Sequence, residues 1–488
     1  MPRIRQVKNL ASVAALHSHL EGLGVEIPMD EEVDPAGALA QPLAITDRSA
    51  GTMTAPNRWA VLPMEGWDGE VDGRPSDLVC RRWDRFAASE AGLVWGEATA
   101  VRPDGRANPR QLVLDETTVD EFAALRARLD PSQLTGLQLT HSGRYARPTT
   151  AGPAPKTVYE HPLLDARVGS DASEVLTDEE LHELVEQFID RAVLAHQAGF
   201  DFVDIKACHG YLGHEFLSAF DRPGPFGGDL EGRTRFLRSI IAGIRRQAPD
   251  LGVAVRLSLF DFVPHTIGEG GVGVPEAPGP YQLAFGGDGS GVGTDLAETH
   301  RVLDMLADLG VGLVCASAGS PYYVPHIQRP AYFPPSDGYQ PPEDPLVGVA
   351  RLIAATAEIA SRHPGITVVG AGLSYLQEWL PNVGQALVDR GIAEAVGLGR
   401  MILSYPHMPA DVMAGRELDR RLICRTFSDC TTAPRSGLIS GCYPLDDFYN
   451  QREERLQLAA LKKAAKARLA VGQGSAKAAP NGRQPSFE

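Results

Sequence analysis

The chain has 488 residues and a formal net charge of −16, and 43% of its residues are hydrophobic. This length allows one large or two ordinary domains, and the apolar share is ample for a core. The negative charge argues against nucleic acid or an anionic membrane as a main partner, and no apolar run approaches the about 18 residues that span a bilayer. Six scattered cysteines do not indicate a disulfide framework, so we expect a reduced, cytoplasmic protein.

Composition divides the chain into three parts. We expect residues 1–44 to form an irregular extension that packs on a core, because they contain acidic and proline-containing stretches. Residues 45–445 alternate short β-rich runs with helical patterns and should form the main domain. Residues 446–488 should form a helix and then a disordered tail, since the last residues, GQGSAKAAPNGRQPSFE, include few apolar side chains.

Eight short β-rich runs in the main domain are candidate strands, and helical patterns separate them. The helix before the fourth run has a capping box at Thr177 and Glu180 and stops at Gly199. Strict alternation of eight strands with helices predicts an α/β fold, a closed (β/α)8 barrel. A doubly wound open sheet is the main rival, but no GxGxxG follows the first strand. The candidate strands are Trp59–Met64, Leu93–Ala98, Leu134–His141, Phe202–Lys206, Val253–Ser258, Gly312–Ala316, Thr367–Ala371 and Ala395–Gly399.

Polar side chains gather at the carboxyl ends of these strands, where the active sites of parallel barrels lie. The fourth strand leads into Lys206, His209 and Tyr211, three side chains that hold charge or move protons. A buried strand followed by a polar loop is the plainer alternative. Arg256 lies within the otherwise apolar fifth strand, so its charge must be paired or bound to a ligand.

Glycine-rich turns follow the last two candidate strands, and each opens a helix. They read GAGLS over residues 370–374 and GLGRM over residues 397–401. Barrels commonly bind phosphate at these two strands, through backbone N–H groups and a helix N-terminus. Arg400 would add a fork of donors to the phosphate oxygens. Together the two turns predict a phosphorylated cofactor.

The chain contains seven motifs in the order in which they occur in one known family: NRWAVLPM, GRANPRQLVLDE, LQLTHSGR, HGYLGHEFLSA, FGGDLEGRTRF, VAVRLS and GLGRMILSYP. Over roughly residues 56–444 the chain resembles the old yellow enzyme family, the FMN-dependent NADH:flavin oxidoreductase barrels. The resemblance implies FMN across the barrel mouth, in contact with segments that line the ring, residues that bind its pyrimidine edge, and a phosphate site. The residues that line the ring are Pro63, Met64, Glu65 and Ala98. The residues that bind its pyrimidine edge are Gln138 and Arg256, and the phosphate site consists of Gly372, Gly399 and Arg400.

The resemblance also implies a reaction on a small molecule. Hydride passes from NAD(P)H to flavin N5, and then to the β-carbon of an activated C=C bond in a carbonyl- or carboxylate-bearing compound. His209 and Lys206 would bind the developing oxyanion, and Tyr211 would supply the proton.

The segment after the sixth strand, SPYYVPHIQRP, is rich in aromatic and imidazole groups. Tyr322, Tyr323 and His326 are candidates for substrate contacts from this segment. The alternative is that they pack the loop onto the barrel.

Two residues depart from the family pattern. Lys206 stands where many members have the first histidine of a substrate-binding pair, and a lysine favours a carboxylate, enolate or carbonyl oxygen over a cationic amine. Glu65 replaces the small Thr or Cys that is common beside the flavin. It either tunes the cofactor, touches the substrate or forms a salt bridge at the rim.

Larger members of the family have an iron–sulfur cluster held by four cysteines after the barrel. In this chain the corresponding region contains Cys424, Cys430 and Cys442, while Thr426 and Phe427 stand where a further ligand would be expected. Three thiolates do not complete a site that needs four cysteine ligands. We therefore expect no cluster, and no other metal site.

Three other functions remain open at this stage. The same fold and flavin would serve a dehydrogenase or demethylase that passes electrons to a partner. A lysine at a strand end is also a Schiff-base candidate, so a lyase that uses Lys206 without flavin is an alternative. A flavin-binding protein without catalysis is the third. The sequence leaves the substrate, the choice between NADH and NADPH, and a homo-oligomer or an electron-transfer partner undecided.

Overall fold

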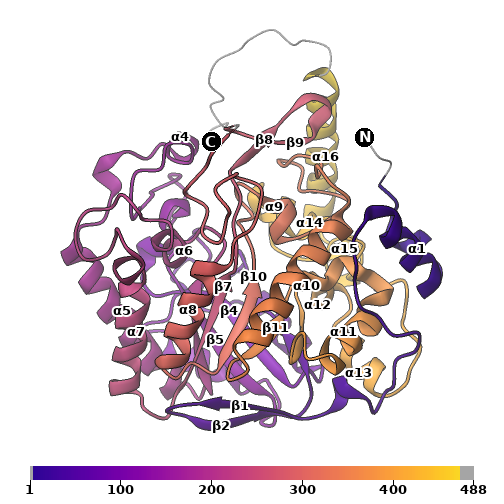
Figure 1. Ribbon diagram of the computed structural model, residues 1–488, viewed down its shortest axis with the longest axis horizontal. Coiled ribbons are helices and arrows are strands. Elements are labelled where there is room, and N and C mark those ends of the chain that lie inside the picture. Colours follow the sequence, from indigo (N-terminus) through magenta and orange to yellow (C-terminus); the bar gives the residue numbers. More distant parts are fainter. Residues whose placement is uncertain (1–3, 278, 473–488) are drawn as a thin grey trace.

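The computed structural model describes residues 4–277 and 279–472, and the predicted disordered tail lies outside the described residues except for its first residue, Gly472. Eight parallel strands close into a barrel in the order β10-β11-β12-β3-β4-β5-β6-β7, and helices surround it (Figure 1). The predicted (β/α)8 barrel is thus confirmed. The barrel strands are β3 (Trp59–Val61), β4 (Leu93–Ala100), β5 (Leu134–Thr140), β6 (Phe202–Ala207), β7 (Gly252–Ser258), β10 (Leu313–Ser317), β11 (Thr367–Gly370) and β12 (Ala395–Leu398).

The long helices between the barrel strands carry buried apolar residues on the face that packs on the barrel, as the periodicity predicts. The capping box at the start of α5 forms between Thr177 and Glu180 as expected, and the helix stops before Gly199, which has a φ of +87°. The longer helices are α2 (Asp77–Ala87), α3 (Val119–Arg126), α5 (Asp178–Gln197), α7 (Leu230–Gln247), α8 (Ala297–Asp308), α10 (Pro345–Arg362), α11 (Leu380–Asp389) and α16 (Glu454–Gly472). The short helices are α4 (Asp165–Val168), α6 (Leu212–Phe216), α9 (Pro325–Gln328), α12 (Arg400–Ser404), α13 (Met408–Met413), α14 (Asp429–Arg435) and α15 (Asp447–Asn450).

The barrel interior is filled by interlocking side chains from neighbouring strands. Trp95 and Phe202 meet edge to face, with ring centroids 5.3 Å apart. A Cβ atom at Gly136 on β5 would lie 2.1 Å from the Phe202 ring, so this glycine leaves the space that the ring occupies. The interior is therefore a packed core, and a ligand can enter only at an end of the barrel.

The N-terminal part is more regular than its composition indicates. Helix α1 (Val13–Leu23) begins at the N-cap Ser12 and ends at Gly24 in the left-handed conformation. Leu16 and Leu20 on this helix are buried. The expectation of an irregular extension is therefore wrong for this segment, because capping residues at both ends and a buried apolar face fix a helix.

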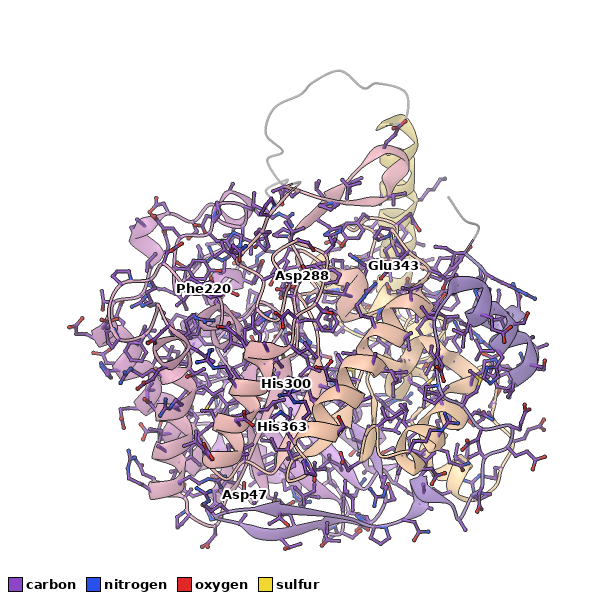
Figure 2. The ribbon with its side chains drawn as sticks, in the orientation of Figure 1. Asp47, Phe220, Asp288, His300, Glu343 and His363 are labelled. Atoms are coloured by element: carbon purple, nitrogen blue, oxygen red, sulfur yellow. The ribbon has the colours of Figure 1, made fainter. Side chains whose placement is uncertain are left out.

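A two-stranded hairpin closes the end of the barrel opposite the strands' carboxyl ends (Figure 1). It pairs β1 (Leu43–Asp47) with β2 (Gly51–Ala55) in antiparallel register. Asp47, labelled at this end in Figure 2, is buried, and its carboxylate accepts both terminal nitrogens of Arg245 on α7, at 2.5 and 2.7 Å. The backbone N–H of Val253 also donates to it, at 3.2 Å.

The opposite, open end carries the long loops and the C-terminal helices. A second hairpin, β8 (His265–Ile267) with β9 (Gly273–Pro275), rises from the loop after β7, and α14 and α16 stand beside the mouth (Figure 1). Within residues 4–277 and 279–472, no helix combines the length and the apolar character that crossing a membrane requires.

Replacing Asp47 by Ala should lower the free energy of unfolding by about 3–5 kcal/mol, because it leaves the Arg245 guanidinium without its buried partner. Urea denaturation at neutral pH measures this loss. Asp190→Ala, at an exposed position of α5, is the matched control and should cost less than about 0.5 kcal/mol. Equal effects of the two changes would contradict this role of Asp47.

Candidate active site

A cavity opens at the carboxyl ends of the barrel strands. Its lining includes all nine residues that the family resemblance assigns to FMN, from Pro63 to Arg400, and also Lys206, His209, Tyr211 and Tyr322. These residues come from both halves of the barrel and meet only because the sheet closes. The candidate residues that the cavity does not contain are Tyr323 and His326.

A buried carboxylate holds the two residues predicted to bind the pyrimidine edge, Gln138 through its side chain and Arg256 through its backbone. Asp204 on β6 accepts the Gln138 amide and, at 2.6 Å, the backbone N–H of Arg256. The Arg256 guanidinium donates to the Pro63 carbonyl at 3.0 Å. Burial raises the pKa of Asp204 to about 6, although these donors oppose the shift. Because the Gln138 NH2 group is engaged by Asp204, its carbonyl oxygen is left to accept from a ligand.

Sequence reasoning missed Asp204, although its signal was present. It is an acidic residue inside an apolar strand, VDIK, two positions before Lys206. The period of two puts both side chains on the same face of β6. Lys206 is also in register with Arg256 on the neighbouring strand β7.

The Lys206 ammonium lies over an aromatic ring instead of against a carboxylate. Its Nζ atom is 3.5 Å from the centroid of the Tyr211 ring, a cation–π contact. Burial lowers the pKa of Lys206, the nearby charge of Glu65 opposes this shift, and Arg256 adds to it. The site therefore places two basic side chains, Lys206 and Arg256, close together.

His209 is held in one orientation by the strand ends around it. It is one of the few described non-glycine residues with a positive φ, +66°, a conformation that the surrounding contacts must stabilise. Its Nε2 atom lies 2.8 Å from Ser317 Oγ and 3.2 Å from the Gln328 amide nitrogen. Burial, then the charges of Arg256 and Lys206, lower the pKa of His209 well below its usual range, so the ring is neutral. With Nε2 accepting from the amide, the remaining proton is on Nδ1.

Glu65 lies inside the cavity as an acceptor for surrounding donors. Tyr211 donates its hydroxyl proton to Glu65 at 2.7 Å, Trp67 donates its indole N–H at 2.9 Å, and Gln111 donates at 3.3 Å. The Tyr322 hydroxyl is 3.0 Å from the Tyr211 oxygen and extends this chain. Of the roles left open for Glu65, contact with the site fits this geometry better than a salt bridge at the rim.

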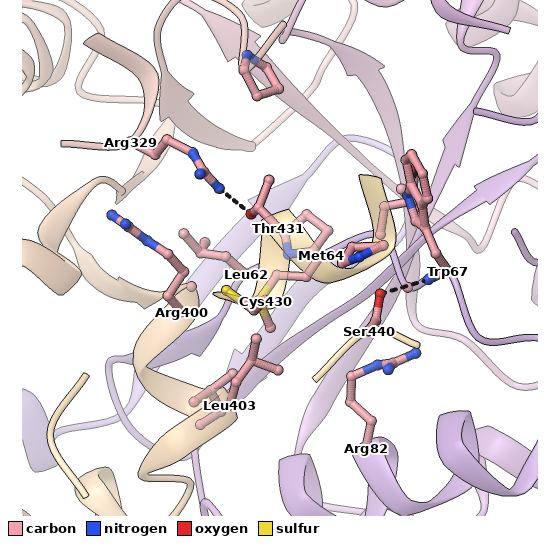
Figure 3. A pocket seen from close by; sticks show the side chains of 18 of the residues that line it. Leu62, Met64, Trp67, Arg82, Arg329, Arg400, Leu403, Cys430, Thr431 and Ser440 are labelled. Atoms are coloured by element: carbon pink, nitrogen blue, oxygen red, sulfur yellow. Dashed lines mark hydrogen bonds between the residues drawn. The ribbon is translucent and has the colours of Figure 1, made fainter. Parts of the chain in front are cut away.

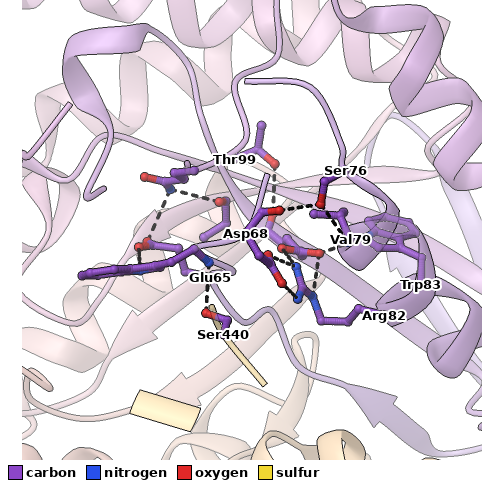
Figure 4. A network of polar contacts seen from close by, with 12 residues as sticks. Glu65, Asp68, Ser76, Val79, Arg82, Trp83, Thr99 and Ser440 are labelled. Atoms are coloured by element: carbon purple, nitrogen blue, oxygen red, sulfur yellow. Dashed lines mark hydrogen bonds and ion pairs between the residues drawn. The ribbon is translucent and has the colours of Figure 1, made fainter. Parts of the chain in front are cut away.

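A buried ion cluster holds the turn that carries Glu65 (Figure 4). Arg82 on α2 donates to Asp68 at 2.7 and 2.8 Å and to Glu97 on β4 at 2.9 Å through two nitrogens. The Cβ atom of any side chain at position 66 would lie 2.3 Å from the Arg82 guanidinium, so Gly66 is needed there. This cluster anchors the turn to the barrel wall.

The two glycine turns form the opposite end of the cavity. Gly372 adopts a φ of +78°, and a Cβ atom at Gly399 would meet open space. Arg400 follows at the start of α12 and donates to the Pro330 carbonyl at 2.8 Å. Its Nη1 atom is buried and has no hydrogen-bond partner among the described residues. An unsatisfied cationic donor beside two glycine turns fits the phosphate that FMN would bring.

Tyr323 and His326 turn away from the cavity. The Tyr323 hydroxyl donates to Asp261 at 2.5 Å, and the His326 ring bonds the Tyr339 hydroxyl at 2.8 Å. Both side chains are buried by these contacts. We therefore correct the expectation that they line the substrate side of the flavin; they pack the loop after β10, which was the alternative.

The three cysteines that come after the barrel strands in sequence lie in or near the cavity. Cys430 and Cys442 line the cavity, and Cys424 is buried. In the part of the chain that the structure describes, no group of three or more His, Cys, Asp or Glu side chains is arranged to hold a metal ion. The absence of an iron–sulfur cluster stays a prediction.

Asp261, which lies beside the site, should make the free energy of unfolding depend on pH. Burial raises its pKa to about 7, so the folded chain keeps a proton that the unfolded chain releases near pH 4. The raised pKa makes the free energy of unfolding fall as the pH rises from 4 to 7. Asp261→Asn removes this dependence, and its stability relative to the parent should rise across that range by up to about 4 kcal/mol. A difference between the two proteins that does not change with pH would contradict this, as measured by urea denaturation at several pH values.

Known proteins match this chain in sequence and fold. Residues 41–272 match the model of the NADH:flavin oxidoreductase / NADH oxidase family. The NADPH dehydrogenase of Bacillus subtilis (strain 168) is 27% identical over 376 residues, which cover 76% of this chain and 93% of that protein.

Two solved structures share the fold. An old yellow enzyme homologue from Zymomonas mobilis has a TM-score of 0.54 at 20% identity, and the match covers 78% of this chain and 94% of that one. A 2-naphthoyl-CoA reductase has a TM-score of 0.63 at 17% identity, and the match covers 86% of this chain but 58% of the reductase. The sequence matches confirm the resemblance that the motifs indicate: residues 41–272 match the model of the NADH:flavin oxidoreductase / NADH oxidase family, and a curated NADPH dehydrogenase matches over most of its length.

Proposed function

We propose that the chain is an FMN-dependent NAD(P)H oxidoreductase that reduces an activated C=C bond in a carbonyl- or carboxylate-bearing small molecule. The observation that carries this proposal is the pair of cations at the barrel mouth. Lys206 and Arg256 stand in register on neighbouring strands. Neither side chain forms a salt bridge within the described residues. Such a pair attracts negative charge that develops on a ligand.

Bound FMN would supply the hydride-transfer step between NAD(P)H and the substrate. The residues of this chain would hold the reacting groups. Arg256 and Gln138 would bind the pyrimidine edge of the ring, where a fixed cation favours the reduced state. Lys206 and the Nδ1–H of His209 would donate to the substrate oxygen and stabilise it as it becomes an enolate.

Tyr211 is the proposed proton donor. Burial and the charge of Glu65 raise the pKa of Tyr211 well above its usual range, so the phenol is protonated at neutral pH. So weak an acid gives its proton only to a strongly basic centre, such as the α-carbon of an enolate. The Tyr322 hydroxyl at 3.0 Å can return a proton to the Tyr211 oxygen afterwards.

A second candidate is a dehydrogenase that oxidises an amine and passes electrons to a partner. Glu65 favours it, because a carboxylate beside Trp67 and Tyr322 would attract an ammonium group. Lys206 disfavours it, since the aromatic face of Tyr211 is already occupied by its cation at 3.5 Å. We therefore favour the reductase.

Anaerobic rapid mixing distinguishes the reductase from the amine dehydrogenase. We expect NADH or NADPH to bleach the flavin, and an α,β-unsaturated ketone such as cyclohexenone to restore its colour. Bleaching by an amine but not by either nucleotide would support the dehydrogenase and overturn the proposal. Borohydride trapping of a carbonyl compound on Lys206 in a colourless protein would instead support a lyase.

Lys206→Met should slow flavin reoxidation by the ketone about 100-fold, while reduction by the nucleotide changes little, because Lys206 stabilises charge on the substrate oxygen. Single-turnover kinetics of each half-reaction measure this split. Lys8→Met, at an exposed position near the N-terminus, is the matched control. An unchanged reoxidation rate in Lys206→Met would remove this residue from the mechanism.

A further inference from the structure

Three guanidinium groups crowd the end of the cavity that holds the glycine turns. Arg329, Arg400 and Arg435 all line it. Arg435 has Asp337 within 3.1 Å. Arg329 and Arg400 form no salt bridge with any described residue. Figure 3 shows these two side chains at the same end of the pocket, on the side of Thr431 away from Trp67.

Arg329 is more completely deprived of partners than Arg400. One of its terminal nitrogens donates to Thr431 Oγ1. Its Nε and Nη2 atoms are buried, and neither finds a hydrogen-bond partner in the described part of the chain. Burial, together with repulsion from Arg400 and Arg435, lowers the pKa of Arg329 to about 9. Buried cationic donors left in this state are costly, so the arrangement is built for an anionic group that would satisfy them.

The negative charge of a phosphate monoester matches the unpaired positive charge of Arg329 and Arg400. Such a group carries about −1.5 to −2 charges at neutral pH and has three acceptor oxygens. One guanidinium would neutralise only part of this charge, whereas Arg329 and Arg400 together balance it. The three orphaned nitrogens of the two side chains equal the number of acceptor oxygens.

We propose that Arg329 is a second guanidinium ligand of the flavin phosphate, opposite Arg400, and that it couples cofactor binding to the docking of the C-terminal segment 426–435. The inference rests on the proposed function, because it requires FMN in this cavity. It adds a ligand from the loop after β10, which lies outside the two glycine turns.

The coupling follows from where Arg329 is attached. The loop over residues 320–340 is bonded to segment 426–435 at several points, and the bond between Arg329 and Thr431 is one of those that line the cavity. Ser428 donates to the Phe333 carbonyl at 2.6 Å, and Arg435 donates to the Pro321 carbonyl at 2.8 Å. A phosphate that neutralises Arg329 removes its repulsion from Arg400 and Arg435. It thereby holds the loop over residues 320–340 against segment 426–435.

Flavin titration of the flavin-free protein tests the phosphate contact. Riboflavin has the same ring as FMN but no phosphate. We expect Arg329→Gln to weaken FMN binding about 10- to 100-fold and to leave riboflavin binding unchanged. Arg329→Lys, which keeps the charge, should recover part of the loss and guards against a folding defect. Arg301→Gln, at an exposed position of α8, is the matched control.

The outcomes separate the inference from the function beneath it. If the parent protein binds FMN and Arg329→Gln binds it equally well, the inference is wrong and the proposed function stands. An equal loss of FMN and riboflavin affinity would also overturn it, since the effect would then come from cavity shape. If the parent binds neither flavin, the proposed function fails and the inference fails with it.

Hydrogen exchange tests the coupling independently of activity. In the parent protein, FMN should slow amide exchange over residues 426–435 more than riboflavin does, and Arg329→Gln should abolish the difference. Equal protection by the two flavins in the parent would show that the phosphate does not act on this segment.

Discussion

The organisation of the site depends on four basic side chains at the barrel mouth that form no salt bridge with any described residue. The chain as a whole has a net charge of −16, yet Lys206, Arg256, Arg329 and Arg400 all line one cavity. Elsewhere the fold pairs its buried charges carefully, as at Arg82 with Asp68 and Glu97. A buried charge without a partner is expensive, so its retention at one place marks where an anionic ligand completes the structure.

The fold makes this arrangement possible by anchoring the charges from below. Asp204 lies beneath the mouth and binds Gln138 and the backbone of Arg256, so neither residue needs a ligand in order to be positioned. Glu65, which also lines the cavity, accepts a hydrogen bond from the Tyr211 hydroxyl and so fixes its position. Each carboxylate keeps a donor or a cation oriented without neutralising Lys206. Preorganisation of this kind is what lets fixed charges act on a reaction.

Much of this could be predicted from the sequence, because it depends on local pattern. The eight strands fall where the β-rich runs predict them, and the capping box starts α5 as expected. The residues that motifs place at strand ends meet in one cavity. Helix α1 was missed although Ser12 and Gly24 signal its ends, because the proline-containing residues after it dominate the composition of that region. Tyr323 and Tyr322 are adjacent and chemically alike, and only the tertiary structure shows that one faces the cavity and the other faces Asp261. Arg329 had no local signal, since its role comes from Arg400 and Thr431, which are distant in sequence.

The position of the phosphorus atom in a crystal structure of the protein with FMN tests the proposed cofactor site most directly. We expect this atom to lie between the guanidinium groups of Arg329 and Arg400, next to the turns at Gly372 and Gly399, with the pyrimidine edge of the ring on Gln138 and Arg256. A flavin bound elsewhere, or a phosphate in contact with solvent while Arg329 stays without a partner, would contradict it.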